Sequence, residues 1–479
     1  MTRMTTALRL VGLSSIALLS SCALTPDYER PALDVPSAYF VDQAQPALSE
    51  SGESIANLAW WQVFEDAQLQ SLIRSALAEN KDMAVAFNRV VQARAQLTST
   101  RANQLPFFDI TGGAQRGRQS EFLVPGGAIA ESFSVMGNLS FELDLWRKLS
   151  RSTESARASL LATEASQRYI ALNIVANVAS AYLLLLDLDE RLIIAQRTVA
   201  SRQSSLAIIQ SRFDKGVIGE LDVNQAQVEL AVAEVAIATF QRQIAQTEHS
   251  LSLLLGRNPG PINRGLSLNE QQLLPEIPTG LPSELLQRRP DVVAAEQTLH
   301  AETALIGVAE ALRYPSLSLT GSYGAVSDEL NDLNDGGAES WAVGGSLFAP
   351  IFNWDQLKAQ SEAQRASAEQ ALHNYEATLQ QAFREVADAL VAIRTYRQEY
   401  QAYHRQATAA RNAERLSLAR YDAGVADYLE VQDASRNLFS AELNESESYQ
   451  RVMSALVALY QALGGGWIPE QIAASTSTP

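Results

Sequence analysis

The chain has 479 residues, and its 54 acidic side chains against 37 basic ones give a formal net charge of −17. Because there is no Lys/Arg-rich run, this charge argues against nucleic-acid binding, which needs a basic surface. The length allows two or three ordinary domains or one large elongated one. The four histidines are scattered without a second histidine at i+4 or a cysteine partner, so the sequence predicts no metal site, no cofactor and no enzyme.

The N-terminus has the pattern of a secretory signal. Two arginines precede an apolar stretch, residues 11–19, that is too short to span a bilayer. Cys22, the one cysteine of the sequence, stands where a bacterial lipoprotein signal has its acylated cysteine. We expect residues 1–21 to be removed and Cys22 to carry a diacylglycerol and a fatty acyl group, which anchor a protein to outer-membrane lipids without spanning them. An ordinary signal peptide with a chance cysteine is the alternative.

The sequence is internally duplicated. Residues 212–223 read RFDKGVIGELDV and residues 420–431 read RYDAGVADYLEV, an offset of 208 residues. The same offset pairs Trp146 with Trp354 and Gly256 with Gly464. Such a register indicates that one structural unit was built and then built again, and duplicated units usually bury faces against each other.

Each copy begins with a helical region. A Pro-containing arm, residues 22–65, precedes the first, which we expect over about Asp66–Asn103 because its apolar residues have helical spacing. Pro106 ends it. The first copy is predicted to span 66–256 and the second 290–464. A Pro-rich equatorial bridge, 257–289, connects them, and a tail, 465–479, follows.

The hydrophobic period then changes from helical to alternating. From Phe133 to Leu145 the odd positions are apolar or glycine and the even positions are mostly polar, which is the length and pattern of a tilted membrane-spanning strand. A shorter alternating segment precedes a Gly/Pro-containing loop. We therefore predict a β-hairpin over about 107–146 and its repeat over about 315–353. A half-buried sheet of a soluble protein is the alternative on the strands alone.

Two long helical hairpins follow, over about 147–256 and about 354–464. Apolar residues recur in steps of three and four along each, the pattern of a coiled-coil seam. Arg202 is the one polar residue at a seam position between Ala171 and Phe213. No Pro or Gly interrupts 147–215, so this helix should run on the order of 100 Å.

The strand count constrains the assembly. Four strands cannot close a barrel, and a sheet in lipid must close so that no edge is left unpaired. Two chains would give about 8 strands, whose interior side chains fill, whereas three would give about 12 and an aqueous channel. The sequence thus predicts an α+β membrane protein, a homotrimer with a 12-stranded β-barrel, a periplasmic α-helical barrel and a mixed equatorial region.

The chain resembles the TolC-like outer-membrane factors, in the lipoprotein branch that serves resistance-nodulation-division efflux pumps. The segments that carry the resemblance are Trp60-Trp61 with Phe64, Phe141–Trp146, Arg288–Val292 and the two Gly-Val turns. The resemblance implies an outer-membrane exit duct for drugs or other toxic small molecules in a Gram-negative bacterium. It also implies a periplasmic adaptor and an inner-membrane transporter as partners. A duct for type I protein secretion and a lipid-anchored periplasmic scaffold are the alternatives.

The resemblance also places functional residues at the two helix reversals. It implies a periplasmic gate formed by acidic, tyrosine and leucine side chains: Asp222, Tyr421, Leu429, Glu430 and Asp433. Near a threefold axis three carboxylates attract cations and three leucines form a constriction that can dewet. Helix N-capping is the alternative role for Asp222, and the same role is open to Asp427, because both lie at the start of a return helix. Some members have an arginine at the position of Ala426, so closure here should depend more on Leu429 and on the ring of acidic side chains. The adaptor should contact the turns themselves, at Lys215, Gly216, Val217, Gly424 and Val425.

Overall fold

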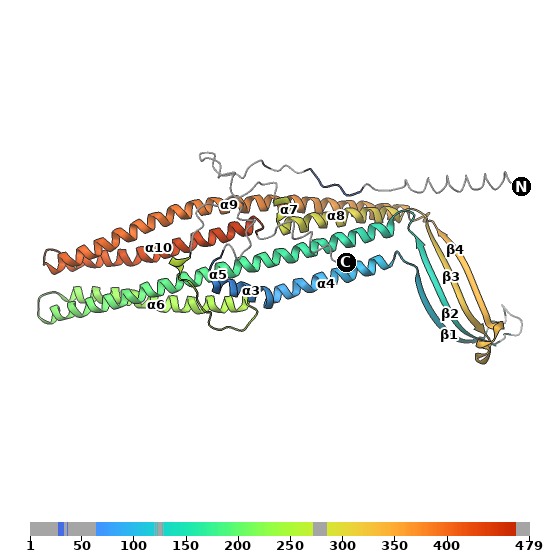
Figure 1. Cartoon of the computed structure of the whole chain (residues 1–479), viewed down its shortest axis with the longest axis horizontal. Helices are drawn as coiled ribbons and strands as arrows, with labels where there is room; N and C mark the ends of the chain where they lie inside the picture. The colour runs from blue at the N-terminus through green and yellow to red at the C-terminus, as the bar shows by residue number, and fades with distance from the viewer. Residues whose placement is uncertain are drawn as a thin grey trace. The chain divides into compact units, whose positions relative to one another are not determined.

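The computed structural model describes residues 27–32, 36, 64–118, 120, 122, 127, 129–271 and 285–465. The signal peptide, Cys22, Trp60-Trp61 and nearly all of the C-terminal tail lie outside the described residues. The first copy comprises α3 Ala67–Glu79, α4 Lys81–Ala102, β1 Phe107–Arg118, β2 Ile129–Leu143, α5 Lys148–Asp214 and α6 Glu220–Leu254. The second comprises α8 Pro290–Ala311, β3 Ser316–Ser327, β4 Glu339–Phe348, α9 Trp354–Asp422 and α10 Tyr428–Ala462 (Figure 1).

Short elements complete the chain. The bridge contains a 3-10 helix, Leu268–Glu270, and the helix α7, Leu285–Arg288. Two further 3-10 helices, Leu330–Asn334 and Gly336–Ala338, occupy the acidic loop between β3 and β4. The chain divides into two compact units, of which the first contains the described parts of Met1–Leu33, Arg89–Glu164 and Ala294–Glu376, and the second contains the rest. Helices α4, α5, α8 and α9 contribute residues to both units.

The first helical region is two helices, not the single helix expected over Asp66–Asn103. Asn80 between them has an extended backbone with φ −61° and ψ 135°. Its side-chain oxygen accepts hydrogen bonds from the backbone N–H groups of Asp82 (2.8 Å) and Met83 (3.2 Å), so it caps α4. The expectation was wrong here because the apolar spacing continues through residue 80, and an asparagine that ends one helix while starting the next does not disturb that spacing.

The four strands form one antiparallel sheet in the order β1-β2-β3-β4. Strands β2 and β3 join the two copies, with Leu139 opposite Gly321 and Leu143 opposite Leu317. The register carries the apolar residues of successive strands onto one face: Phe108 opposite Leu139, Phe141 opposite Leu319, and Tyr323 opposite Trp341. The expected alternation is therefore a property of the whole sheet.

Much of the apolar face of the sheet is exposed within the chain. The side chains of Ile110, Tyr323, Trp341 and Val343 are between 64% and 82% exposed. The opposite face is polar, and Asn138 there donates to Asp109 and Thr111, both at 3.2 Å. Among the described strands, β1 and β4 each pair on one side only. A sheet with an exposed apolar face and two open edges requires partners for both.

Aromatic side chains anchor the ends of these strands. The indole nitrogen of Trp146 donates to the backbone oxygen of Pro315 at 2.7 Å, and its ring lies 5.1 Å from that of Tyr314. The repeat-equivalent Trp354 has the guanidinium of Arg313 4.5 Å from its ring centroid. The chain thus leaves the sheet through a layer of amphipathic side chains, as in the aromatic girdles of membrane barrels.

The N-terminal arm is held in the same unit as the sheet. Arg30 forms two hydrogen bonds of 2.6 Å with the buried carboxylate of Glu296 on α8. The ring of Tyr28 stacks on His300 at 4.4 Å, and burial raises the pKa of Tyr28 to about 12. Asp27 accepts from the buried Arg151 of α5 at 2.8 Å. We call these contacts of residues 27–30 the arm clasp.

In each copy, the residue that precedes α4 or α8 binds the C-terminal end of the return helix, α6 or α10. We call this contact the joint of that copy, and its chemistry differs between the two copies. In the first copy the amide of Asn80 donates to the carbonyl of Leu254 at 2.8 Å; in the second Arg289 donates to Ala462 at 3.0 Å. A Cβ on Gly256 would lie 2.1 Å from the carbonyl oxygen of Glu79, and one on Gly464 would lie 3.1 Å from Arg288. Only the second joint is charged, because Arg289 also binds Asp291 and Glu385.

Helix α5 contains a long apolar stretch. By length and composition this stretch could cross a membrane, but 61% of it is buried inside the structure. Val178, Ala179, Tyr182 and Leu185 are fully buried along it. Its apolar character therefore belongs to helix packing.

The backbone of Gly256 lies so close to Glu79 that adding one methyl group at Gly256 should destabilise the protein. We expect Gly256→Ala to lower the free energy of unfolding by about 2–3 kcal/mol, because it combines a φ of +69° with the clash against Glu79. Gly219→Ala is the control, since Gly219 has a φ of −86° and a Cβ added there would have no atom within 4 Å. Thermal unfolding of the detergent-solubilised protein measures both, and equal midpoints would contradict the close approach.

Candidate functional site

The two helix reversals have the same backbone geometry. Gly216 and Gly424 both have a φ of +72°, which confirms the expectation that these positions need a left-handed conformation. The N–H of Val217 donates to Arg212 and that of Val425 to Arg420, each at 3.0 Å. Both turns lie in the second compact unit.

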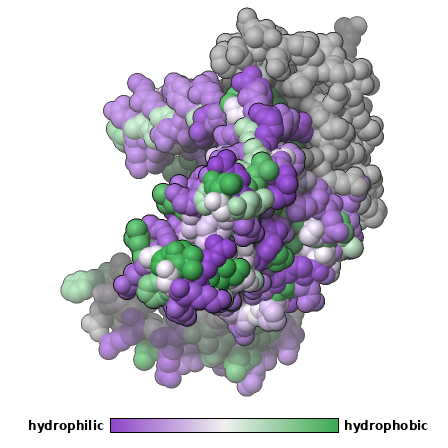
Figure 2. Space-filling view, turned by 90° about the vertical axis from the view of Figure 1, so that its left-hand side faces the viewer, coloured by the Kyte–Doolittle hydropathy of each residue, from purple (hydrophilic) through white to green (hydrophobic). Residues whose placement is uncertain are grey.

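Apolar side chains are exposed around these turns. Figure 2 looks onto the turns and shows green apolar groups set among purple polar ones. The exposed apolar residues are Val217, Leu221, Val425 and Leu429, of which the first three are at least 66% exposed. Lys215, Gly216 and Gly424 are exposed beside them. Apolar groups in this number on a turn surface are typical of a surface that contacts another protein.

Within one chain, three of the predicted gate residues lie on an exposed face of α10. Leu429 is 49% exposed, and Glu430 and Asp433 are exposed as well. Glu430 pairs with Arg420 at 3.2 Å and Asp433 pairs with Arg436 at 3.5 Å. These exposed ion pairs are weak, so they leave both carboxylates available to another partner.

Tyr421 is placed differently. It packs with Tyr428, 5.5 Å away between ring centroids, against an apolar cluster of the first hairpin that contains Ile209, Val223 and Ala226. The guanidinium of Arg212 lies 4.5 Å from the centroid of the Tyr421 ring. Tyr421 therefore holds the tip of the second hairpin against the first, and a contact of this kind contributes about 0.5–2 kcal/mol.

The acidic residues at the helix starts divide into two kinds. Asp427 is the N-cap of α10, and its carboxylate accepts from the N–H of Glu430 at 3.2 Å. Helix α6 instead begins after Gly219, with no side-chain cap. Asp222 lies in the first turn of α6 and no cap hydrogen bond to its side chain is present. The capping alternative thus holds for Asp427 and not for Asp222.

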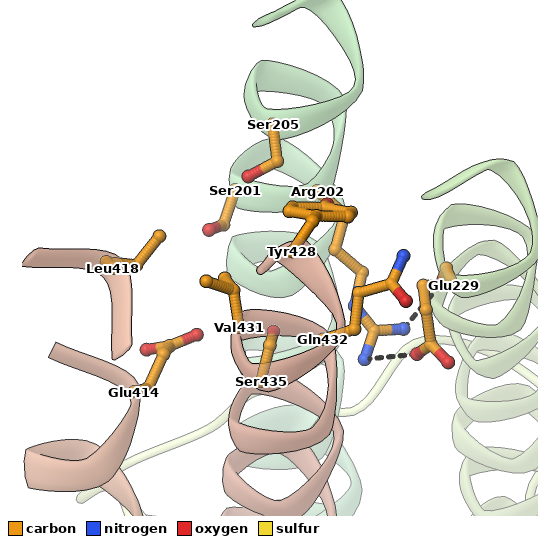
Figure 3. Close-up of a pocket in the computed structure, with 10 residues that line it drawn as sticks. All are labelled: Ser201, Arg202, Ser205, Glu229, Glu414, Leu418, Tyr428, Val431, Gln432 and Ser435. Atoms are coloured by element: carbon orange, nitrogen blue, oxygen red, sulfur yellow. Dashed lines mark hydrogen bonds and ion pairs between the residues drawn. The ribbon is translucent and has the colours of Figure 1, made fainter. Parts of the chain in front are cut away.

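A small polar cavity lies behind these tips, and Figure 3 shows its lining. Its volume is about 30 Å³, room for about two water molecules and none for a transported solute. Four helices line it: α5 with Ser201, Arg202 and Ser205; α6 with Glu229; α9 with Glu414 and Leu418; and α10 with Tyr428, Val431, Gln432 and Ser435. Sequence reasoning singled out Arg202 but none of its partners.

Further polar contacts tie α10 to the first hairpin. Arg197 on α5 binds the buried carboxylate of Glu442, and the hydroxyl of Ser446 donates to the buried Asp187 at 2.6 Å. Burial raises the pKa of Asp187, opposed by the neighbouring charge of Arg191. The two hairpins are therefore joined by charged side chains at several levels along their length.

No catalytic constellation is formed in the part of the chain that the structure describes. Three of its histidines pair singly with glutamates, as His404 does with Glu445 at 2.6 Å, and no group of three or more His, Cys, Asp or Glu side chains could hold a metal ion there.

Comparison with known proteins defines the class. A sequence model of the family described as outer membrane efflux protein matches residues 72–257 and 281–465. The outer membrane protein OprJ of Pseudomonas aeruginosa is 35% identical over 474 residues, covering 95% of this chain and 96% of that protein. The cation efflux system protein CusC of Escherichia coli is 34% identical, covering 94% and 96%. The crystal structure of the open MtrE outer membrane channel of Neisseria gonorrhoeae matches with a TM-score of 0.84 and 31% identity over 93% of this chain and 98% of that one.

These matches identify an outer-membrane channel. The chain belongs to the outer membrane efflux protein family, and the two matched segments confirm the internal duplication. It is an efflux duct of the outer membrane with a helical periplasmic part, and its family consists of channels rather than enzymes. The resemblance drawn from the sequence and the expected fold class are confirmed.

The two acidic positions predict different responses to truncation. We expect Asp427→Ala to lower the free energy of unfolding by about 1 kcal/mol, because α10 loses its side-chain N-cap. Asp222→Ala should change it by less than about 0.5 kcal/mol, as is usual for a surface residue without such a contact. Denaturant unfolding of both variants measures the difference. An equal loss would show that Asp222 has a structural role after all.

Proposed function

We propose that the protein is a homotrimer whose three sheets form one 12-stranded barrel, and that it is the passive exit duct of a tripartite pump for drugs or other toxic small molecules. The observation that carries the proposal is the sheet. Its apolar face is exposed and its outer strands β1 and β4 each pair on one side, so three copies would pair every edge and turn every apolar face to lipid.

The polar face of the sheet would then line the lumen. Asp109, Thr111 and Asn138 lie on it, together with Ser318 and Ser322 of β3. Twelve strands leave a water-filled interior, which suits solutes of varied chemistry. The long helices, 67 residues in α5 and 69 in α9, would continue the duct over on the order of 100 Å through the periplasm.

The partners follow from the kind of duct. A channel without an energy source needs a transporter in the inner membrane and an adaptor between the two. Relatives of similar identity are named for different cargoes, CusC for cation efflux and TtgC of Pseudomonas putida for toluene efflux. We infer that the inner-membrane transporter selects the cargo and that the duct does not.

The lipid anchor belongs to the same proposal. Cys22 would carry a diacylglycerol and a fatty acyl group in the outer membrane. The arm clasp supports this, because it begins five residues after Cys22 and holds the arm in the unit that contains the sheet.

The gate would be formed at the helix reversals. The exposed face of α10 presents Leu429 and Asp433 one turn apart, with Glu430 beside them and Asp222 on the neighbouring hairpin. In a trimer these would form a leucine constriction and a carboxylate ring, while Tyr421 would hold the second hairpin against the first.

Removal of the constriction should open the channel. We expect the double variant Leu429→Ala, Asp433→Ala to increase the spontaneous open probability in planar bilayers by about tenfold or more. The variant loses both the leucine constriction and the carboxylates of Asp433. Cation selectivity should fall as well. Leu253→Ala, an exposed leucine of α6 near the bridge, is the control. Unchanged conductance and unchanged selectivity would remove both residues from the gate.

The turns would be the adaptor contact. We propose that Lys215, Gly216, Val217, Gly424 and Val425 meet a helical hairpin of the adaptor. A photoreactive amino acid at Val217 should crosslink to the adaptor in intact cells, whereas one at Thr247, far along α6, should not. Absence of the crosslink in a pump that still exports would count against this surface.

A further inference from the structure

Arg202 is a charged residue at a position where the seam of α5 is otherwise apolar. It is buried, 5% exposed, and its guanidinium lies between the two helical hairpins. One of its nitrogens donates to the backbone carbonyl of Glu229 and another lies 3.1 Å from the Glu229 carboxylate (Figure 3). Its charged end also lies 5.4 Å from the centroid of the Phe439 ring on α10. One arginine thus contacts α6 of its own hairpin and α10 of the other.

Glu229 completes a bridge between the hairpins. Its second carboxylate oxygen accepts from Arg436 of α10 at 3.0 Å. The carboxylate therefore lies between Arg202 of the first hairpin and Arg436 of the second. Arg436 in turn contacts Asp433, one of the proposed gate residues, at 3.5 Å.

This cluster occurs in one copy of the duplication only. At the offset of 208 residues, Ala410 stands for Arg202, Asn437 for Glu229 and Ala231 for Phe439, and Val228 stands for Arg436. The equivalent positions in the second hairpin and in α6 therefore hold small or neutral residues. The charges are a feature of one interface, between the first hairpin and α10.

Stability does not explain such a cluster. Burial disfavours the charged form of Arg202 and lowers its pKa. A buried ion pair contributes little net stability and can be replaced by apolar residues at no loss. What a polar group in an apolar seam does provide is a single register, because every shifted packing leaves it without a partner.

We propose that Arg202 is a positioning residue for the gate: through Glu229, Arg436 and Phe439 it fixes the register in which α10 lies against the first hairpin, and with it the positions of Leu429 and Asp433. The inference rests on the proposed gate. Leu429 and Asp433 lie seven and three residues before Arg436 on the same helix, so a shift of α10 moves them directly.

Arg202→Met is the informative variant. Glu229 keeps Arg436 as a partner at its other carboxylate oxygen, so the carboxylate retains a positive neighbour, and the methionine continues the apolar seam of α5. We expect the thermal midpoint of the full-length protein to stay the same or rise, while the spontaneous open probability in planar bilayers increases by about tenfold. Arg202→Lys, which keeps the charge but not the planar fork, should lie between the wild type and Arg202→Met.

The chain offers a matched control. Arg197 is also on α5 and also binds a glutamate of α10, Glu442, which Arg411 binds as well at 3.0 Å. The side chain of Arg197 is 61% exposed, against 6% for Arg202. We expect Arg197→Met to leave the open probability within about twofold of the wild type, because the Arg197 side chain is mostly solvated and Glu442 keeps Arg411 as a partner.

The outcomes separate the inference from the gate itself. If the Leu429/Asp433 variant opens the channel and Arg202→Met does not, the gate stands and the role of Arg202 is wrong. If neither opens it, both proposals are wrong. If Arg202→Met opens the channel but lowers the thermal midpoint as Gly256→Ala does, Arg202 is a structural residue and the inference is overturned. Opening at an unchanged or higher midpoint, with Arg197→Met silent, supports it.

Discussion

The backbone hydrogen bonds at the two edges of the sheet impose the constraint on which the rest of this molecule depends. Strands β1 and β4 each leave one row of N–H and C=O groups unpaired within the described chain, and the apolar face between them is exposed. Lipid offers no partner for such groups, so the sheet is complete only among copies of itself. The proposed trimer, the lumen and the helical duct all follow from closing these edges. In the proposed trimer, the exposed face of α10 would lie opposite its counterparts near the threefold axis.

The two copies share one fold but differ in the chemistry of their contacts. The joint at Asn80 is neutral whereas the equivalent joint at Arg289 holds an arginine between two carboxylates. The cluster around Arg202 likewise has no counterpart in the other copy. Both differences add charge to contacts made by the second hairpin, in helices α9 and α10. Two copies with the same fold can therefore differ in how firmly and in which register each is held.

Periodicity predicted most of the fold because each element here follows one period over a long distance. Alternation gave the strands, three-and-four spacing gave the long helices, and glycine gave both reversals, where φ is +72°. The break at Asn80 was missed because a cap that starts the next helix leaves the apolar spacing intact. The partners of Arg202 could not be read from the sequence, since Glu229 and Phe439 come from two other helices and their meeting depends on tertiary register. Whether the tip residues form a gate is a property of three chains, and one sequence contains only the family resemblance that suggests it.

The arm clasp has a consequence for how deeply the channel lies in its membrane. Five residues, fully extended, reach at most about 18 Å. If Cys22 is acylated as proposed, Asp27 can lie no further than this from Cys22, and Arg151 contacts Asp27 at 2.8 Å. Arg151 belongs to the same compact unit as the sheet. The proposed acyl chains would therefore lie within a limited distance of the apolar band of the strands. The proposed tether would therefore limit how far the strands can shift along the membrane normal.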